Sequence, residues 1–298
     1  MTQDSKARYC LLFGGVLWGL YWMPMKQIEG AGLSGTAPAL AMFLVAGVLA
    51  VPILIWRWRS LVARSWDFAL VGLLAGGALA MFTIALAETE IVRAILLFYL
   101  SPVWSTALGL IFLGDRPNAA RVTTLTLGLV GLVIVLGVEG GFPWPRNVGD
   151  TLALISGMCW SLASLKLFRM KSVAVPDMVA SFFVGCAANT VGLHLALGGS
   201  LPRDAVISVA PWVLFATLYI MPTLTMTLWP ATVLVPAKAG LLLMTEVVVG
   251  TLSAALLSGE PFGLREAVGC ILITGALVAE VIMPAPNVKT YRSDHAAQ

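Results

Sequence analysis

The chain has 298 residues, of which 59% are hydrophobic and 11% charged, and its formal net charge is +3. Soluble domains average roughly half apolar and a quarter charged residues, so this chain has more apolar side chains than a soluble fold of its size can bury. The connections between its apolar runs are too short for an ATP-binding or nucleic-acid-binding domain, and no glycine-rich phosphate loop occurs. The composition therefore predicts an integral membrane protein that does not itself use ATP.

Apolar runs of about twenty residues recur along the chain, and about twenty helical residues cross the hydrocarbon core of a bilayer. Strands of a barrel would alternate apolar and polar residues, whereas residues 125–138 are apolar on every face. The sequence thus predicts an all-α membrane protein with ten transmembrane helices. Their expected ranges are 9–28, 36–56, 67–87, 91–113, 120–139, 148–169, 178–198, 206–228, 235–257 and 264–283.

Lys and Arg residues are distributed unequally between the two sides of this bundle. If the amino-terminus is cytoplasmic, the inner side carries eleven of these residues and the outer side carries five. The inner ones are Lys6, Arg8, Arg57, Arg59, Arg64, Arg116, Arg121, Arg169, Lys171, Lys289 and Arg292. The outer ones are Lys26, Arg93, Arg146, Arg203 and Arg265. Because cytoplasmic loops carry an excess of Lys and Arg, we expect both termini in the cytoplasm. Lys166 and Lys238 lie inside expected spans near their cytoplasmic ends, where long side chains usually extend to the interface.

The two halves of the chain resemble each other. Six residues of the fourth span recur 145 positions later in the ninth: Ala94, Leu96, Leu97, Val103, Thr106 and Gly114 fall on Ala239, Leu241, Leu242, Val248, Thr251 and Gly259. Gly15 and Trp18 likewise recur as Gly157 and Trp160. Since each half holds five spans, an odd number, the second enters the membrane from the opposite side. We expect two inverted five-helix repeats, residues 1–145 and 146–298, in one transmembrane domain.

Short motifs in both halves resemble those of a known transporter family. They are Trp18-Gly19, the stretch Leu100-Ser101-Pro102-Val103, and Gly114-Asp115-Arg116-Pro117 with its echo Gly259-Glu260-Pro261. In these residues the chain resembles the drug/metabolite transporter superfamily, EamA-like branch, and looks most like bacterial aromatic amino acid exporters of the YddG type. The resemblance implies amino acid export across the bacterial cytoplasmic (inner) membrane, without enzymatic activity or a cofactor. The family often has Glu-Pro where this chain has Glu246-Val247. The sequence therefore leaves open whether the ninth helix is kinked.

Polar and aromatic residues gather near the expected midplane, where inverted-repeat transporters bind their solutes. Trp and Tyr ordinarily occupy the interfacial belts of a membrane protein, so their presence at this depth suggests a cavity. The candidate substrate-binding residues are Trp18, Trp22, Tyr99, Ser101, Pro102, Trp160, Ser164, Thr217, Tyr219 and Glu246. Other roles remain open: the Trp rings can simply pack between helices, Pro102 can be a passive kink, and Ser or Thr hydroxyls often bond to their own helix.

Glu246 is the sharpest of these candidates. A carboxylate at the bilayer centre costs about 2.5–3.5 kcal/mol on insertion scales, so it should face water or protein, be protonated or have a counter-charge. Aromatic faces attract an ammonium group by cation–π contact, and a carboxylate can pair with it. An amino acid or an organic cation therefore fits the expected site, with Glu246 also a possible proton carrier.

The sequence favours a secondary transporter that works by alternating access, as a monomer or homodimer within membrane lipid and with no nucleic-acid partner. Exporters of drugs or organic cations and a passive channel are the alternatives. A membrane enzyme would need catalytic clusters that are not present, since the chain has two His residues. The four cysteines, Cys10, Cys159, Cys186 and Cys270, stand apart, so neither a metal site nor a cofactor is expected.

The expected topology is directly testable. Reporter fusions after Arg64 and Lys171 should report the cytoplasm, and fusions near Arg146 and Arg203 should report the outside, because the excess of Lys and Arg orients the bundle. Activity of a periplasmic reporter fused after Arg64 would contradict both the orientation and the inverted repeat.

Overall fold

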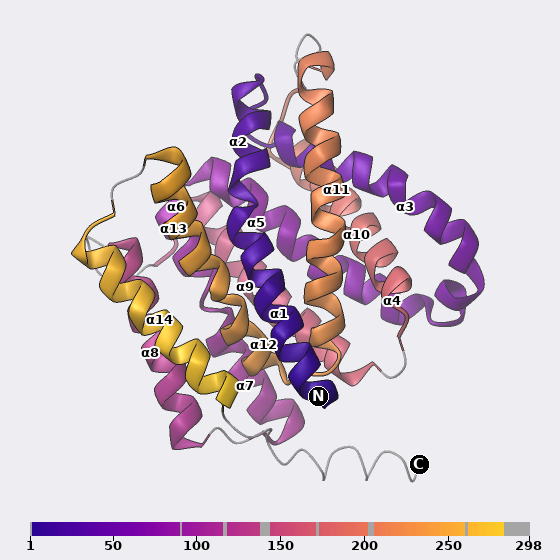
Figure 1. Ribbon diagram of the computed structural model, residues 1–298. Helices are drawn as coiled ribbons and strands as arrows, with labels where there is room; N and C mark the ends of the chain where they lie inside the picture. Colours follow the sequence, from indigo (N-terminus) through magenta and orange to yellow (C-terminus); the bar gives the residue numbers. More distant parts are fainter. Residues whose placement is uncertain are drawn as a thin grey trace.

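A computed structural model describes residues 2–89, 91–115, 118–137, 144–170, 173–201, 206–259 and 262–282, and every element within them is helical (Figure 1). The elements are α1 (Gln3–Leu20), α2 (Trp22–Gly30), α3 (Ala37–Ala63), α4 (Ser65–Val71), the π-helical segment η1 (Gly72–Gly76), α5 (Gly77–Glu88), α6 (Ile91–Phe98), α7 (Ser101–Leu113), α8 (Ala119–Leu136), α9 (Val148–Arg169), α10 (Val175–Ala196), α11 (Val206–Ala231), α12 (Pro236–Leu243), α13 (Thr245–Ser258) and α14 (Leu264–Ile282).

Eight of the ten expected spans are long and apolar enough to cross a membrane. They are Ala37–Ala63, Ser65–Glu88, Arg93–Leu113, Ala119–Leu136, Val148–Arg169, Val175–Ala196, Ser208–Ala231 and Pro236–Ser258. Among the described residues, eight helices thus meet the requirement by length and composition, and the expectation of ten spans stays a prediction. The other two, α1 and α14, each carry three charged residues, at Asp4, Lys6 and Arg8 and at Arg265, Glu266 and Glu280. Both helices nonetheless pack within the bundle, α1 against α11, α12 and α13, and α14 against α8 (Figure 1).

Three of the expected helices are interrupted rather than continuous. α1 and α2 meet at Tyr21, α6 and α7 at Tyr99 and Leu100, and α12 and α13 at Met244. The ninth expected helix is thus broken although no proline lies at the break. This answers the question, left open by the sequence, of whether that helix is kinked. There the N–H groups of Met244 and Val247 bond to carbonyls three residues back, both at 3.0 Å. Such bonds tighten the backbone locally into a 3₁₀-type turn.

Both helix-ending motifs begin with a glycine in the left-handed conformation. Gly114 closes α7 with φ 63° and Gly259 closes α13 with φ 70°. Glycine adopts this conformation without the steric cost of a Cβ, which explains its place in both motifs. The motif residues Arg116, Pro117, Glu260 and Pro261 lie outside the described residues.

α10 packs on the π-helical segment with almost no side chain between the two backbones. A Cβ built on Gly185 would lie 1.9 Å from the carbonyl oxygen of Gly72. A Cβ built on Gly76 would lie 2.6 Å from the carbonyl oxygen of Phe182. Small residues at helix contacts let backbones approach closely inside a membrane. The thiol of Cys186 lies 3.3 Å from the Gly76 carbonyl and provides one polar contact across this surface.

Gly185→Ala should therefore destabilise the protein by about 1–3 kcal/mol, because the added methyl group forces the two backbones apart. Gly192→Ala is the matched control on the same helix, since no atom lies within 4 Å of the Cβ position at Gly192. Thermal unfolding in detergent measures both. Equal melting temperatures for the two variants would show that the close contact does not limit stability.

Candidate functional site

The three helix interruptions lie in helices that pack on one another. α1 packs on α12 and α13, α12 on α7, and α7 on α9. A Cβ built on Gly19 of α1 would lie 2.7 Å from the carbonyl oxygen of Glu246, and one built on Gly240 of α12 would lie 3.4 Å from Pro102. The interrupted segments of the first, fourth and ninth expected helices therefore form one contiguous region of the bundle.

The interruption at Tyr21 leaves a carbonyl group without its usual helical donor. The N–H of Tyr21 bonds to the carbonyl of Trp18 at 3.0 Å. The carbonyl of Leu17 instead accepts a hydrogen bond of 2.6 Å from the Tyr219 hydroxyl of α11. In hydrocarbon an unpaired carbonyl costs several kcal/mol, so Tyr219 stabilises the break.

A second tyrosine has the same role at Met244. The Leu243 carbonyl accepts a 3.4 Å hydrogen bond from the Tyr99 hydroxyl, which also interacts with the Glu246 side chain. Tyr99 itself lies at the interruption between α6 and α7 and is 1% exposed. The Tyr99 side chain thus connects the breaks in the fourth and ninth expected helices with the half-buried carboxylate of Glu246.

Pro102 lies in the first turn of α7 and has no N–H to offer the carbonyl of Phe98. The backbone of α9 closes over this carbonyl, since a Cβ at Gly157 would lie 2.6 Å from its oxygen. In the same region the hydroxyl of Ser161 in α9 donates to the carbonyl of Ser101 at 2.9 Å. The break before α7 is therefore closely packed against α9.

The two tryptophans of the first expected span fasten it to other helices. Trp18 Nε1 donates to Thr227 Oγ1 of α11 at 3.0 Å, and Trp22 Nε1 donates to Ser253 Oγ of α13 at 3.0 Å. The Trp18 ring also packs edge-on against Tyr21, with centroids 5.6 Å apart. Trp160, the counterpart of Trp18 in the sequence repeat, is buried in α9 with 7% exposure.

The candidate residues with side-chain hydroxyl groups differ in their hydrogen bonding. Thr217 Oγ1 bonds back to the Val213 carbonyl of its own helix at 2.7 Å. Ser164 Oγ, in contrast, is buried and has no hydrogen-bond partner among the described residues, and the same holds for Ser105 Oγ of α7. An unsatisfied buried hydroxyl retains the full capacity to bind a polar group. Ser105 is an addition to the residues selected from the sequence.

Glu246 is the second residue of α13, in its first turn. The amino-terminus of a helix carries a partial positive charge that stabilises a carboxylate. Within the described part of the chain no Lys or Arg forms an ion pair with Glu246, and its polar neighbour is Tyr99. The carboxylate is thus held in the bundle by a helix terminus and a phenol, without a protein cation.

The position of the Lys238 side chain contradicts the expectation from the sequence that it extends to the membrane interface. It is 2% exposed, its Nζ has no hydrogen-bond partner in the described chain, and it lies 3.9 Å from the carboxylate of Glu280 in α14. Glu280 also accepts a 3.4 Å hydrogen bond from Thr124 of α8, and Arg8 of α1 donates to the neighbouring Val281 carbonyl. This cluster joins four helices near the start of α1. Lys166, in contrast, is 26% exposed and pairs with Asp67 at 2.5 Å.

The described residues contain no group of three His, Cys, Asp or Glu side chains that could hold a metal ion. Their polar chemistry consists of hydroxyls, carbonyls and single carboxylates.

Residues 6–137 match the EamA-like transporter family. The amino-terminal part of the chain is therefore EamA-like. An uncharacterized transporter of Vibrio cholerae serotype O1 is 26% identical over 151 residues, which cover 47% of this chain and 49% of that protein. The match thus spans about half the length of this curated relative. A crystal structure of another protein shares the fold, with a TM-score of 0.70 and 21% identity over 92% of this chain and 96% of that one.

An ion pair that sequence reasoning missed fastens the EamA-like segment to the rest of the chain. Arg93 pairs at 2.5 Å with Asp150, which is 0% exposed. The hydroxyl of Thr89 and the N–H of Arg146 donate to the same carboxylate at 2.7 and 2.9 Å. No motif singled out Asp150, because its ion-pair partner Arg93 lies 57 residues away. A carboxylate at the start of an expected helix was the available signal.

The Lys238 and Glu280 cluster leads to a stability prediction. Glu280→Gln should destabilise the protein by about 3–5 kcal/mol, because it leaves the buried Lys238 ammonium without a counter-charge. The double variant Lys238→Met/Glu280→Leu should recover most of that loss. Thermal unfolding of the three purified proteins measures this, and a double variant less stable than Glu280→Gln would contradict the pairing.

Proposed function

We propose that this chain is a secondary transporter that exports amino acids, aromatic or hydrophobic ones in particular, across the bacterial cytoplasmic membrane by alternating access. The EamA-like match of residues 6–137 supports membrane transport in general. The choice of an amino acid rests on the chemistry around Glu246 and on the resemblance of the sequence motifs to aromatic amino acid exporters.

The observation that carries the proposal is a half-buried carboxylate without a cationic partner in the described chain. Glu246 lies beside Tyr99 at the break between α12 and α13. A charge at this depth persists only where a partner compensates its desolvation. A solute ammonium group supplies such a partner, and a charge-assisted hydrogen bond is roughly twice as strong as a neutral one.

Aromatic side chains on α1, the helix that packs on α13 beside Glu246, suit an apolar solute body. Trp18 and Tyr21 form an edge-on pair in the first expected span, and the α1 backbone touches the Glu246 backbone through Gly19. Aromatic rings bind apolar groups over a large area and attract ammonium groups by cation–π contact. An amino acid with an aromatic or aliphatic side chain combines both properties.

Broken helices beside the site also support alternating access. Discontinuous helices at the interface between repeats are a recurring feature of transporters whose two halves rock about a central site. The breaks at Tyr99 and Met244 occupy equivalent positions in the 145-residue sequence repeat. In our proposal residues 1–145 and 146–298 are the two inverted halves, with both termini in the cytoplasm.

Glu246→Gln tests the proposal, because it retains size and hydrogen bonding but removes the charge. In proteoliposomes the KM for the transported amino acid should rise about tenfold, as a neutral hydrogen bond replaces a charge-assisted one, while turnover persists at high concentration. Glu29→Gln is the matched control, since Glu29 is exposed at the end of α2. The first step is a counterflow screen of amino acids and organic cations with the parent protein.

Other outcomes identify the alternatives. Preference for organic cations over amino acids would assign the protein to drug or cation export. Flux without saturation or counterflow would indicate a passive channel. Loss of pH-driven accumulation with intact exchange in Glu246→Gln would make Glu246 a proton carrier instead of a ligand for the solute.

A further inference from the structure

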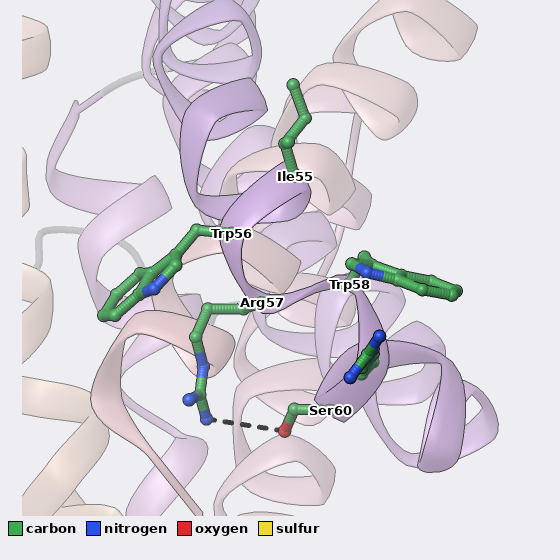
Figure 2. A pocket seen from close by; sticks show the side chains of 6 residues that line it. Ile55, Trp56, Arg57, Trp58 and Ser60 are labelled. Atoms are coloured by element: carbon green, nitrogen blue, oxygen red, sulfur yellow. Dashed lines mark hydrogen bonds between the residues drawn. The ribbon is translucent and has the colours of Figure 1, made fainter.

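The carboxyl-terminal end of α3 presents aromatic and basic side chains on the outside of the bundle. Trp56 is 72% exposed and Trp58 56% exposed, and Trp66 at the start of α4 is 78% exposed. A cavity of about 450 Å³ is lined by Ile55, Trp56, Arg57, Trp58, Arg59 and Ser60. Figure 2 shows the rings of Trp56 and Trp58 on opposite sides of Arg57 and Ser60. We call these six residues the α3 surface.

The length of α3 places this surface at the level of lipid headgroups. The helix has 27 residues and is therefore about 40 Å long, whereas the hydrocarbon core is about 30 Å thick. About twenty residues from Ala37 reach Trp56, so the last two turns extend beyond the core. Exposed tryptophans at this level are typical of the membrane interface.

Part of the α3 surface is fixed in position by α10. Arg57 Nε lies 2.7 Å from Asp177 Oδ1 and Arg57 NH2 lies 2.9 Å from Asp177 Oδ2. The hydroxyl of Ser60 donates to the same carboxylate at 2.6 Å. A bidentate Arg–carboxylate pair holds its guanidinium in one orientation. The cavity therefore has one ordered cationic wall, formed by Arg57, whose side chain is still 30% exposed.

The surroundings retain an excess of positive charge. Four cations gather at this corner, Arg57, Arg59, Arg64 and Lys166, whereas the acidic partners there are Asp67 and Asp177. Arg59 is exposed, and its described contact is with the face of Trp58, at 5.8 Å from the ring centroid. A cation stacked on an interfacial tryptophan retains its hydrogen-bond donors for an anion. A phosphate group complements this charge and this donor geometry.

We propose that the α3 surface binds the phosphate headgroup of an anionic phospholipid. Arg59 contacts the phosphate oxygens, and the ring of Trp58, on which Arg59 stacks, covers the glycerol and upper acyl region. In the expected orientation this end of α3 faces the cytoplasmic leaflet, where the anionic surface potential attracts basic side chains. The inference concerns a lipid site at the surface and is independent of the solute that the bundle carries.

Native mass spectrometry of the full chain in detergent tests the site, with phosphatidylglycerol and phosphatidylcholine titrated separately. The parent should retain phosphatidylglycerol preferentially. Arg59→Gln should weaken that binding about fivefold, the effect of one basic residue near an anionic surface. Trp58→Leu should also weaken it, since the ring orients Arg59 and covers the lipid.

Lys6→Gln is the control, because it removes one exposed positive charge on the same expected side, away from the cavity. Its phosphatidylglycerol binding should equal that of the parent. An equal loss in Lys6→Gln and Arg59→Gln would overturn the site in favour of net charge. Displacement of the lipid by tens of millimolar inorganic phosphate, or equal retention of phosphatidylcholine, would also overturn it. A monodisperse elution profile checks that each variant is folded.

Discussion

Inside a membrane every backbone N–H and carbonyl has to find its partner within the protein, and the arrangement of this bundle depends on that constraint. Three of its helices are broken, and at two of the breaks a tyrosine hydroxyl from another helix bonds to a freed carbonyl. The Tyr219 hydroxyl bonds to the Leu17 carbonyl and the Tyr99 hydroxyl to that of Leu243. At the third, before Pro102, the backbone of α9 packs closely through Gly157, and the Ser161 hydroxyl donates to the Ser101 carbonyl. The broken segments are therefore stable only while these helices stay together.

The same constraint explains where the charges lie. Two ion-paired carboxylates fasten helices to one another, Asp150 with Arg93 and Asp177 with Arg57. Glu280 lies farther from its cation Lys238, at 3.9 Å, and joins several helices at one end of the bundle. Glu246 differs from all three, since its stabilisation comes from a helix terminus and Tyr99. A carboxylate left without a cation among paired ones is the property expected of a ligand for a solute or a proton.

Close backbone packing makes these polar contacts possible. Glycines at Gly19, Gly157 and Gly185 bring helices within reach of a neighbouring carbonyl or main chain. Larger side chains there would move the hydroxyl donors out of hydrogen-bond range. The close glycine contacts and the hydrogen bonds to freed carbonyls are thus parts of one arrangement, and a conformational change in this bundle would have to exchange them together.

The sequence by itself determined the all-helical class and the approximate positions of the helices, because hydrophobic length is a local property that does not depend on neighbouring helices. It also selected Tyr99, Tyr219 and Glu246 as polar or aromatic residues at unusual depth. Only the tertiary structure decided their partners, such as the Leu17 carbonyl for Tyr219, about two hundred residues away. The break at Met244, the buried Lys238 and the Asp150 ion pair were equally invisible in the sequence. Each depends on which helices touch and in which register, and an apolar sequence carries little information about either.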